Sequence, residues 1–112
     1  MELEQRLENN VMCVKLLEKR LDARSAGGFK EQMSGLIEAG NKRIALDISE
    51  VQFVDSSGLG AIVSALKQLG DKGDLVIGGA HDTVLSMFKL TRLDKVFRIF
   101  NRPDEAVAAL AQ

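Results

Sequence analysis

The sequence has no tryptophan and no tyrosine, and it contains one cysteine, one proline and one histidine among its 112 residues. The single Cys13 excludes an intramolecular disulfide, and a reducing cytoplasm is the simplest compartment for such a chain. Cys13 and His81 are far apart and provide no ligand set for a metal ion, so we expect no cofactor. Because tryptophan and tyrosine are absent, the core must be mainly aliphatic, with help from five phenylalanines and four methionines.

The sequence also lacks an excess of charge of either sign. Fifteen Lys and Arg residues stand against sixteen Asp and Glu residues, which argues against direct binding to nucleic acid or to a membrane surface. No apolar run approaches the roughly 20 residues of a membrane span. The acidic, polar stretch 1–5 is unlike a secretory signal. With 46% hydrophobic residues, the chain is long enough for one domain, spanning 1–112, with a real core.

The central stretch 42–69 organises the rest of the chain. Residues 44–48 are apolar and rich in β-branched side chains, which predicts a buried strand. A polar hexapeptide, 55–60, follows with the sequence DSSGLG. An apolar stripe then recurs at the spacing of an amphipathic helix, formed by Leu59, Ile62, Val63 and Leu66. A strand, a turn and a helix N-terminus offer unpaired N–H groups to an anion, which we interpret as a phosphate attached to a serine.

Shorter patterns on both sides complete an α/β fold. Two strands at 3–8 and 11–17 fit a hairpin with an Asn-Asn turn, although 3–8 could also be a helical turn. The remaining patterns predict helices with apolar stripes at 29–37 and 84–88, a helix opening at Pro103, and strands at 75–77 and 96–100. Strands that alternate with helices indicate a largely parallel sheet. We therefore expect a mixed sheet of four or five strands, with about four helices mainly on one face.

The polar residues of the chain also fit purely structural roles. Asp55, Ser56 and Ser57 are all strong N-cap residues and could serve only to cap the helix. A serine hydrolase is disfavoured because Val54, not glycine, stands two residues before Ser56. The loop 78–81 has neither the lysine nor the spacing of a phosphate-binding loop, and we do not expect its histidine to be catalytic. Cys13 lies among apolar residues and is interpreted as an inert core thiol.

The segments 44–47 and 51–60 together resemble the anti-sigma factor antagonists, small bacterial proteins built as a STAS domain. The resemblance covers most of the chain, because three further segments occur in the expected order: Leu21-Asp22, Gly73-Asp74-Leu75, and 87–93 before Val96-Phe97. It implies a single STAS domain with successive βα units. This sequence departs from the usual pattern at Lys19-Arg20, where many relatives have a glycine before the Leu-Asp loop that is expected to border the docking surface.

The resemblance also implies a function, which is a protein-interaction switch and not an enzyme. Ser56 would be phosphorylated by the partner, an anti-sigma factor serine kinase with a histidine-kinase-like ATP fold. The unphosphorylated protein would hold this kinase and free a sigma factor, and a PP2C-type phosphatase would reset the phosphorylated form. The residues expected to bind the partner are Asp22, Asp55, Ser56, Ser57, Gly58, Leu59 and Gly60.

Two alternatives keep the fold but change the role. The domain could be a subunit of a larger assembly, such as a membrane transport complex, without phosphorylation. It could also be a partner switch that acts on a target other than a sigma factor.

Overall fold

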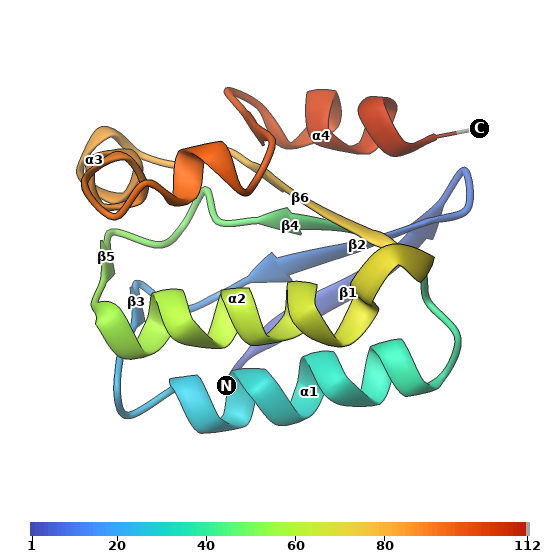
Figure 1. Ribbon diagram of the computed structural model, residues 1–112, viewed down its shortest axis with the longest axis horizontal. Coiled ribbons are helices and arrows are strands. Elements are labelled where there is room, and N and C mark those ends of the chain that lie inside the picture. The colour runs from blue at the N-terminus through green and yellow to red at the C-terminus, as the bar shows by residue number, and fades with distance from the viewer. Residues whose placement is uncertain (112) are drawn as a thin grey trace.

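The computed structural model describes residues 1–111 and has an α/β fold (Figure 1). Its strands are β1 (Leu3–Glu8), β2 (Val11–Leu16), β3 (Arg20–Leu21), β4 (Arg43–Asp47), β5 (Phe53–Val54), β6 (Asp74–Gly78) and β7 (Ile99–Phe100). Its helices are α1 (Ala26–Glu38), α2 (Ser56–Leu69), α3 (Asp82–Leu90) and α4 (Pro103–Leu110), with two short 3-10 turns, η1 (Gly70–Lys72) and η2 (Leu93–Lys95).

The main sheet has five strands in the order β1-β2-β4-β6-β7. The first pair is antiparallel and the other pairs are parallel. This arrangement confirms the predicted α/β class and the mixed sheet, and it confirms the strand interpretation of residues 3–8. Asn9 and Asn10 close the hairpin with φ angles of 51° and 67°. Asparagine tolerates this left-handed backbone better than most residues, and a two-residue turn of this hand suits the twist of a hairpin.

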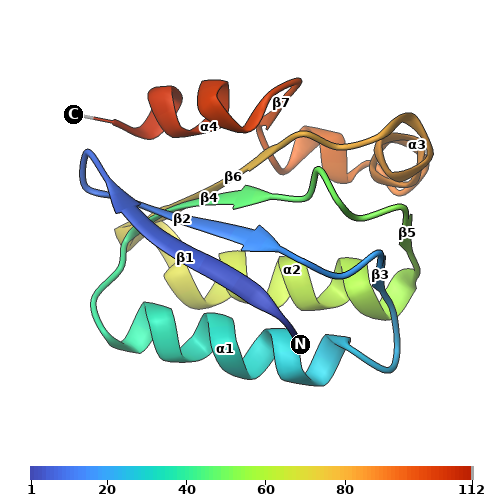
Figure 2. The same cartoon turned by 180° about the vertical axis from the view of Figure 1, so that it is seen from behind.

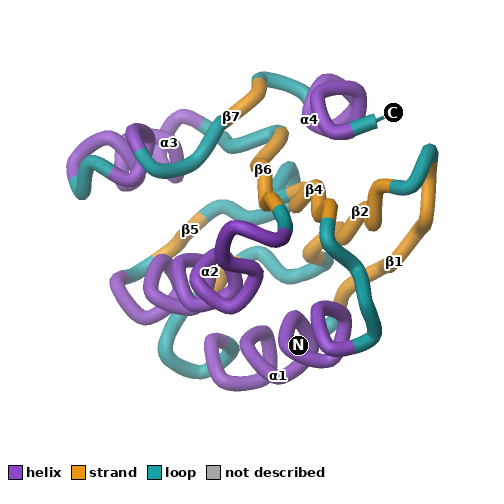
Figure 3. Tube along the Cα trace, turned by 45° about the vertical axis from the view of Figure 1, so that its right-hand side comes forward, coloured by secondary structure: helices purple, strands orange, loops and turns teal. Residues whose placement is uncertain are grey.

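Helices cover the two faces of the sheet unequally. Figure 3 shows α1 and α2 side by side on one face and α4 on the other. The larger apolar cluster lies under α1 and α2 and includes the fully buried side chains of Phe29, Ile44 and Ile62. A smaller cluster joins α4 to the sheet through Val11, Ala45, Val76, Ala106, Val107 and Leu110. The predicted helices are thus present, but α4 lies opposite the α1–α2 layer.

Two local predictions need correction. The expected strand at 96–100 is reduced to Ile99–Phe100, because Leu93–Lys95 form a 3-10 turn and Val96 is 56% exposed. In α2, Leu59 and Ile62 are buried as predicted, whereas Val63 and Leu66 are only partly buried at the margin of the core. The buried face of α2 continues instead through Ala65 and Leu69.

Candidate functional site

The hexapeptide 55–60 forms the junction between β5 and α2, so its serines lie on the first helical turn. Asp55 is the N-cap residue, with extended backbone angles, and α2 begins at Ser56. One carboxylate oxygen of Asp55, Oδ1, accepts a hydrogen bond of 2.9 Å from the backbone N–H of Gly58. This bond satisfies one of the N–H groups that a helix leaves unpaired at its start. The capping role therefore belongs to Asp55, and the serine hydroxyls are not needed for it.

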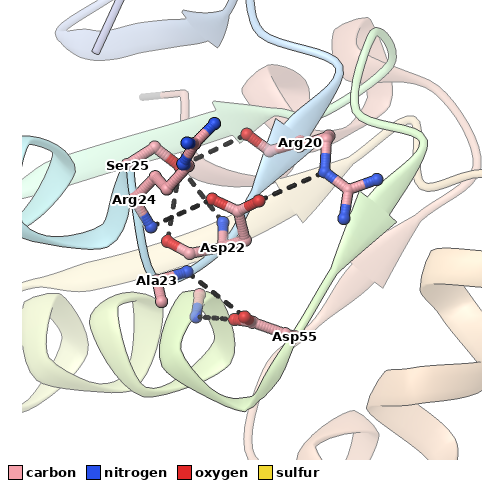
Figure 4. Close-up of polar contacts among 7 residues, drawn as sticks. Arg20, Asp22, Ala23, Arg24, Ser25 and Asp55 are labelled. Atoms are coloured by element: carbon pink, nitrogen blue, oxygen red, sulfur yellow. Dashed lines mark hydrogen bonds and ion pairs between the residues drawn. The ribbon is translucent and has the colours of Figure 1, made fainter.

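The second oxygen of Asp55 ties α2 to a distant loop. Asp55 Oδ2 accepts a hydrogen bond of 3.2 Å from the backbone N–H of Ala23, in the loop between β3 and α1 (Figure 4). The backbone N–H of Asp55 donates to the carbonyl oxygen of Leu21 at 3.3 Å. One residue thus caps the helix, joins it to the loop through its side chain, and joins it to the end of β3 through its backbone.

Gly58 is required by the same junction. It is buried, and a Cβ atom built on it would lie 2.2 Å from the carbonyl oxygen of Leu21 and 2.9 Å from the carbonyl carbon. Since these are backbone atoms, no side-chain rotation could make room. Gly60, in contrast, has nothing within 4 Å of such a Cβ. Of the two glycines in the motif, Gly58 therefore lets the loop approach the helix, and Gly60 leaves open space on the surface.

The loop preceding α1 is organised by Asp22. Its carboxylate forms an ion pair of 3.1 Å with Arg20 Nε and accepts a hydrogen bond of 3.1 Å from the backbone N–H of Arg24 (Figure 4). The Arg20 side chain, and to a lesser degree the Arg24 N–H, lowers the pKa of Asp22 below its usual value of 3.8. Ser25 occupies the N-cap position of α1 without making a side-chain capping bond. Its hydroxyl instead accepts from the N–H of Asp22 at 3.1 Å.

A two-stranded parallel ribbon, β3 and β5, carries further residues to this site. Arg20 pairs with Phe53 in the ribbon, and its guanidinium carbon lies 4.2 Å from the centre of the Phe53 ring. Phe53 remains 42% exposed although it is a large apolar side chain. Sequence reasoning missed Phe53, and it noted Arg20 only as a departure beside the loop expected to border the docking surface. The available signal was an aromatic side chain two positions before Asp55, in a segment too short to show periodicity.

The structure brings the predicted residues together, but it does not expose all of them. Ser56, Ser57 and Gly60 are exposed, and Asp22 and Asp55 are half-buried. Gly58 and Leu59 are buried against the protein itself, and Leu59 is 4% exposed. These two residues therefore contribute to the surface only indirectly, by packing beneath the exposed residues and fixing their positions. Binding of a partner by any of these residues remains a prediction.

The other polar candidates lie apart from this junction. His81 is held by a hydrogen bond between its Nε2 and the backbone carbonyl of Ser49. Cys13 is only partly buried and does not lie in the core as predicted. It packs against the smaller apolar cluster on the α4 side of the sheet, and this partial burial raises the pKa of its thiol. It lines a groove of about 370 Å³ between β1, β2, β4 and α4 that contains none of the predicted site residues.

Two further features concern only residues 1–111. None of the helices there is both long and apolar enough to cross a lipid bilayer. The same residues contain no group of three or more His, Cys, Asp or Glu side chains placed to hold a metal ion.

Comparison with known proteins assigns the family. The STAS domain family model matches residues 3–106. An anti-sigma-B factor antagonist from Listeria monocytogenes is 32% identical over 82 residues, which cover 72% of each chain. The chain therefore belongs to the STAS domain family, and it is similar to the anti-sigma factor antagonists within that family.

Solved structures share the fold at lower sequence identity. An anti-sigma factor antagonist from Mycobacterium paratuberculosis superposes with a TM-score of 0.89 at 20% identity, covering 97% of this chain and 92% of the other. The Bacillus cell fate determinant SpoIIAA in its phosphorylated form gives a TM-score of 0.72 at 18% identity, covering 96% of this chain and 98% of SpoIIAA. At these identities the likeness establishes the common fold.

Proposed function

We propose that the protein is an anti-sigma factor antagonist whose binding to its partner is controlled by phosphorylation of Ser56. The observation that carries this proposal is that different residues at the start of α2 make the structural contacts and form the exposed surface. Asp55 caps the helix and Gly58 fits against Leu21, so the exposed Ser56 is not needed for either contact. A modification of Ser56 can therefore change the surface without dismantling the junction.

The position of Ser56 suits a phosphate. Ser56 is the first residue of α2, where the backbone N–H groups of the first turn have no partner within the helix. A phosphate adds about −1.5 to −2 charges and three strong acceptor oxygens. At the positive end of the helix dipole, such a group is stabilised by roughly 0.3–1 kcal/mol. Phosphorylation should therefore leave the fold intact.

The same phosphate would be costly inside a docked interface. Like charges brought together in an interface cost several kcal/mol, and burying the phosphate adds a desolvation cost. Changing a complex from 99% to 1% bound needs about 5.5 kcal/mol. One phosphate can thus supply most of a switch. Phosphorylation of the fold relative SpoIIAA, and the antagonist relatives in general, support the choice of a regulatory phosphate over a purely structural cap.

The partners follow from this function. The unphosphorylated protein binds an anti-sigma factor that is also a serine kinase of histidine-kinase-like ATP fold, and a PP2C-type phosphatase removes the phosphate. The docking surface comprises Ser56, Ser57, Gly60 and Asp22, together with the stacked pair Arg20 and Phe53. Exposed Phe and Arg side chains are typical of the residues that dominate protein interfaces. The protein acts in this scheme by binding, in the cytoplasm, without catalysing a reaction.

Site mapping tests the proposal. Incubation with ATP and the kinase-type anti-sigma factors of the source organism should add one phosphate, measured by intact-protein mass spectrometry. Ser56→Ala should abolish the addition, and Ser57→Ala is the matched control that should retain it. The reverse pattern would move the site by one residue. Absence of labelling by every such kinase would favour a constitutive subunit of a larger assembly.

A further inference from the structure

Strand β1 is a free edge of the main sheet. It pairs with β2 on one side and ends the strand order of the sheet, and Figure 2 shows it at the front of the molecule. Every residue of β1 except Leu3 is exposed, and Leu7 is 64% exposed. An exposed edge strand presents unpaired backbone N–H and C=O groups to which another strand can add.

The register with β2 fixes which backbone groups point outward. The N–H of Leu17 donates to the carbonyl oxygen of Glu2 at 3.0 Å, so Glu2 and Leu17 form a hydrogen-bonded pair. Hydrogen-bonded and non-hydrogen-bonded pairs alternate along an antiparallel ladder. The even-numbered residues of β1 therefore bond to β2. The residues that direct their backbone groups away from the sheet are Leu3, Gln5 and Leu7.

We propose that a second copy of this chain pairs with this edge, β1 against β1, in an antiparallel register centred on Gln5. A two-fold axis through the edge makes such a contact isologous and closed. In this register Gln5 faces Gln5 of the second copy, and Glu4 faces Arg6 of the second copy. Symmetry forms the Glu4–Arg6 pair twice. Opposite charges directly across a strand pair stabilise it.

The apolar residues agree with the same register. Leu3 lies on the α1 side of the sheet, where it packs against the larger apolar cluster. Leu7 has the same parity along the strand and shares that face. The register centred on Gln5 places Leu7 opposite Leu3 of the second copy, so pairing covers an apolar side chain that is now 64% exposed.

Other registers are less favourable. Centring the pair on Glu4 would place two glutamates face to face, and centring it on Arg6 would do the same with two arginines. Like charges directly opposite destabilise a strand pair. A register centred on Leu7 pairs Arg6 with Glu8, but it overlaps only the end of the strand, because the chain turns away at Asn9 with a φ of 51°. The charges of β1 thus favour one register with long overlap.

The dimer joins the two main sheets into one continuous sheet and is independent of the proposed function. It uses neither α2 nor the loop before α1, so each copy keeps its own Ser56. The contact involves one strand of six residues per copy, which is small beside standard interfaces. We therefore expect a weak dimer, with the fraction of dimer rising with protein concentration.

Sedimentation equilibrium over increasing protein concentration tests the dimer. The wild type should shift from monomer towards dimer. Arg6→Glu and Glu4→Arg each replace two attractions by two repulsions, and each should weaken the dimer at least about tenfold. Arg6 is 69% exposed and its 3.1 Å ion pair with Glu8 lies at the surface, so its substitution should change stability by no more than about 1 kcal/mol and leave the fold intact. The double variant Glu4→Arg/Arg6→Glu should dimerise again.

Lys67→Glu, an equal charge change on the exposed surface of α2, is the control and should dimerise like the wild type. A wild type that stays monomeric at all concentrations would overturn the proposal. So would single variants that dimerise as well as the wild type.

Cross-linking tests the register, using a Cys13→Ser background to remove the native thiol. A hydrogen-bonded cross-strand pair has its Cα atoms about 5.5 Å apart, which a disulfide can span. Gln5→Cys should therefore form a covalent dimer on mild oxidation. Leu7→Cys should not, because residue 7 faces residue 3 of the second copy. Cross-linking through Leu7→Cys and not through Gln5→Cys would overturn the register centred on Gln5.

Discussion

The two sides of the start of α2 are built differently. On the inner side, Gly58 touches the backbone of Leu21 and Ile62 is fully buried. On the outer side, Ser56 is exposed and Gly60 faces open space. The inner side therefore tolerates little change, whereas the outer side can accept a new group. A switch that must alter binding without unfolding needs this separation, which α2 provides within about its first two turns.

The largest expected effect comes from the inner side. Ile62→Ala should lower the free energy of unfolding by roughly 2–5 kcal/mol, because it removes a fully buried side chain and leaves a cavity. Leu66→Ala, at the margin of the core, should cost less. Chemical denaturation of both variants checks this order. A larger loss for Leu66→Ala would show that the inner face of α2 has been assigned wrongly.

The two glycines of the motif give a sharper contrast. Gly58→Ala should destabilise the protein by about 1–3 kcal/mol or more, because its Cβ would overlap the Leu21 carbonyl. Gly60→Ala should stabilise it by up to about 1 kcal/mol, since alanine favours a helix and nothing lies within 4 Å. Denaturant unfolding measures both. Equal effects of the two substitutions would contradict the assigned packing of Gly58.

Asp55 and Ser56 are neighbours with different expected costs. Asp55→Ala should lose about 0.5–2 kcal/mol, because it removes the helix cap and the bond to Ala23. Ser56→Ala should stay within about 0.5 kcal/mol of the wild type, as exposed substitutions usually do. Thermal and denaturant unfolding compare them. If Ser56→Ala costs the more, the serine is part of the cap.

The smallest expected effect concerns the pH dependence of Asp22. Its pKa is lowered in the folded protein, chiefly by Arg20, so it contributes stability above its usual pKa of 3.8. That contribution is lost as the pH falls through the lower, folded-state pKa. The difference in melting temperature between wild type and Asp22→Asn should therefore be largest near neutral pH and shrink in acid. A constant difference would exclude the ionised carboxylate as its cause.

Periodicity was enough to predict the frame of the site. The apolar run at 44–48, the polar hexapeptide and the stripe beginning at Leu59 indicated a strand, a turn and a helix in the right order. The residue types at the turn also predicted that Asp55, Ser56 or Ser57 could cap the helix, and the structure gives this role to Asp55. Local patterns succeed here because each of these elements is long enough to show its repeat.

Local sequence patterns could not predict the ribbon formed by β3 and β5. Each strand has only two residues, which show no period, and their pairing joins Arg20 to the distant Phe53. The sequence also showed two glycines without showing which one meets a neighbour. That distinction depends on the position of Leu21, a property of the tertiary structure.

The central claim is that a phosphate on Ser56 changes binding and leaves the fold unchanged. The most direct measurement is titration calorimetry of the kinase-type partner against two forms of the protein, one unmodified and one with phosphoserine incorporated at position 56. Thermal unfolding of both forms is recorded in parallel. We predict similar melting temperatures and an affinity at least about tenfold lower for the phosphorylated form, which corresponds to about 1.4 kcal/mol. Equal affinities of the two forms would contradict the account.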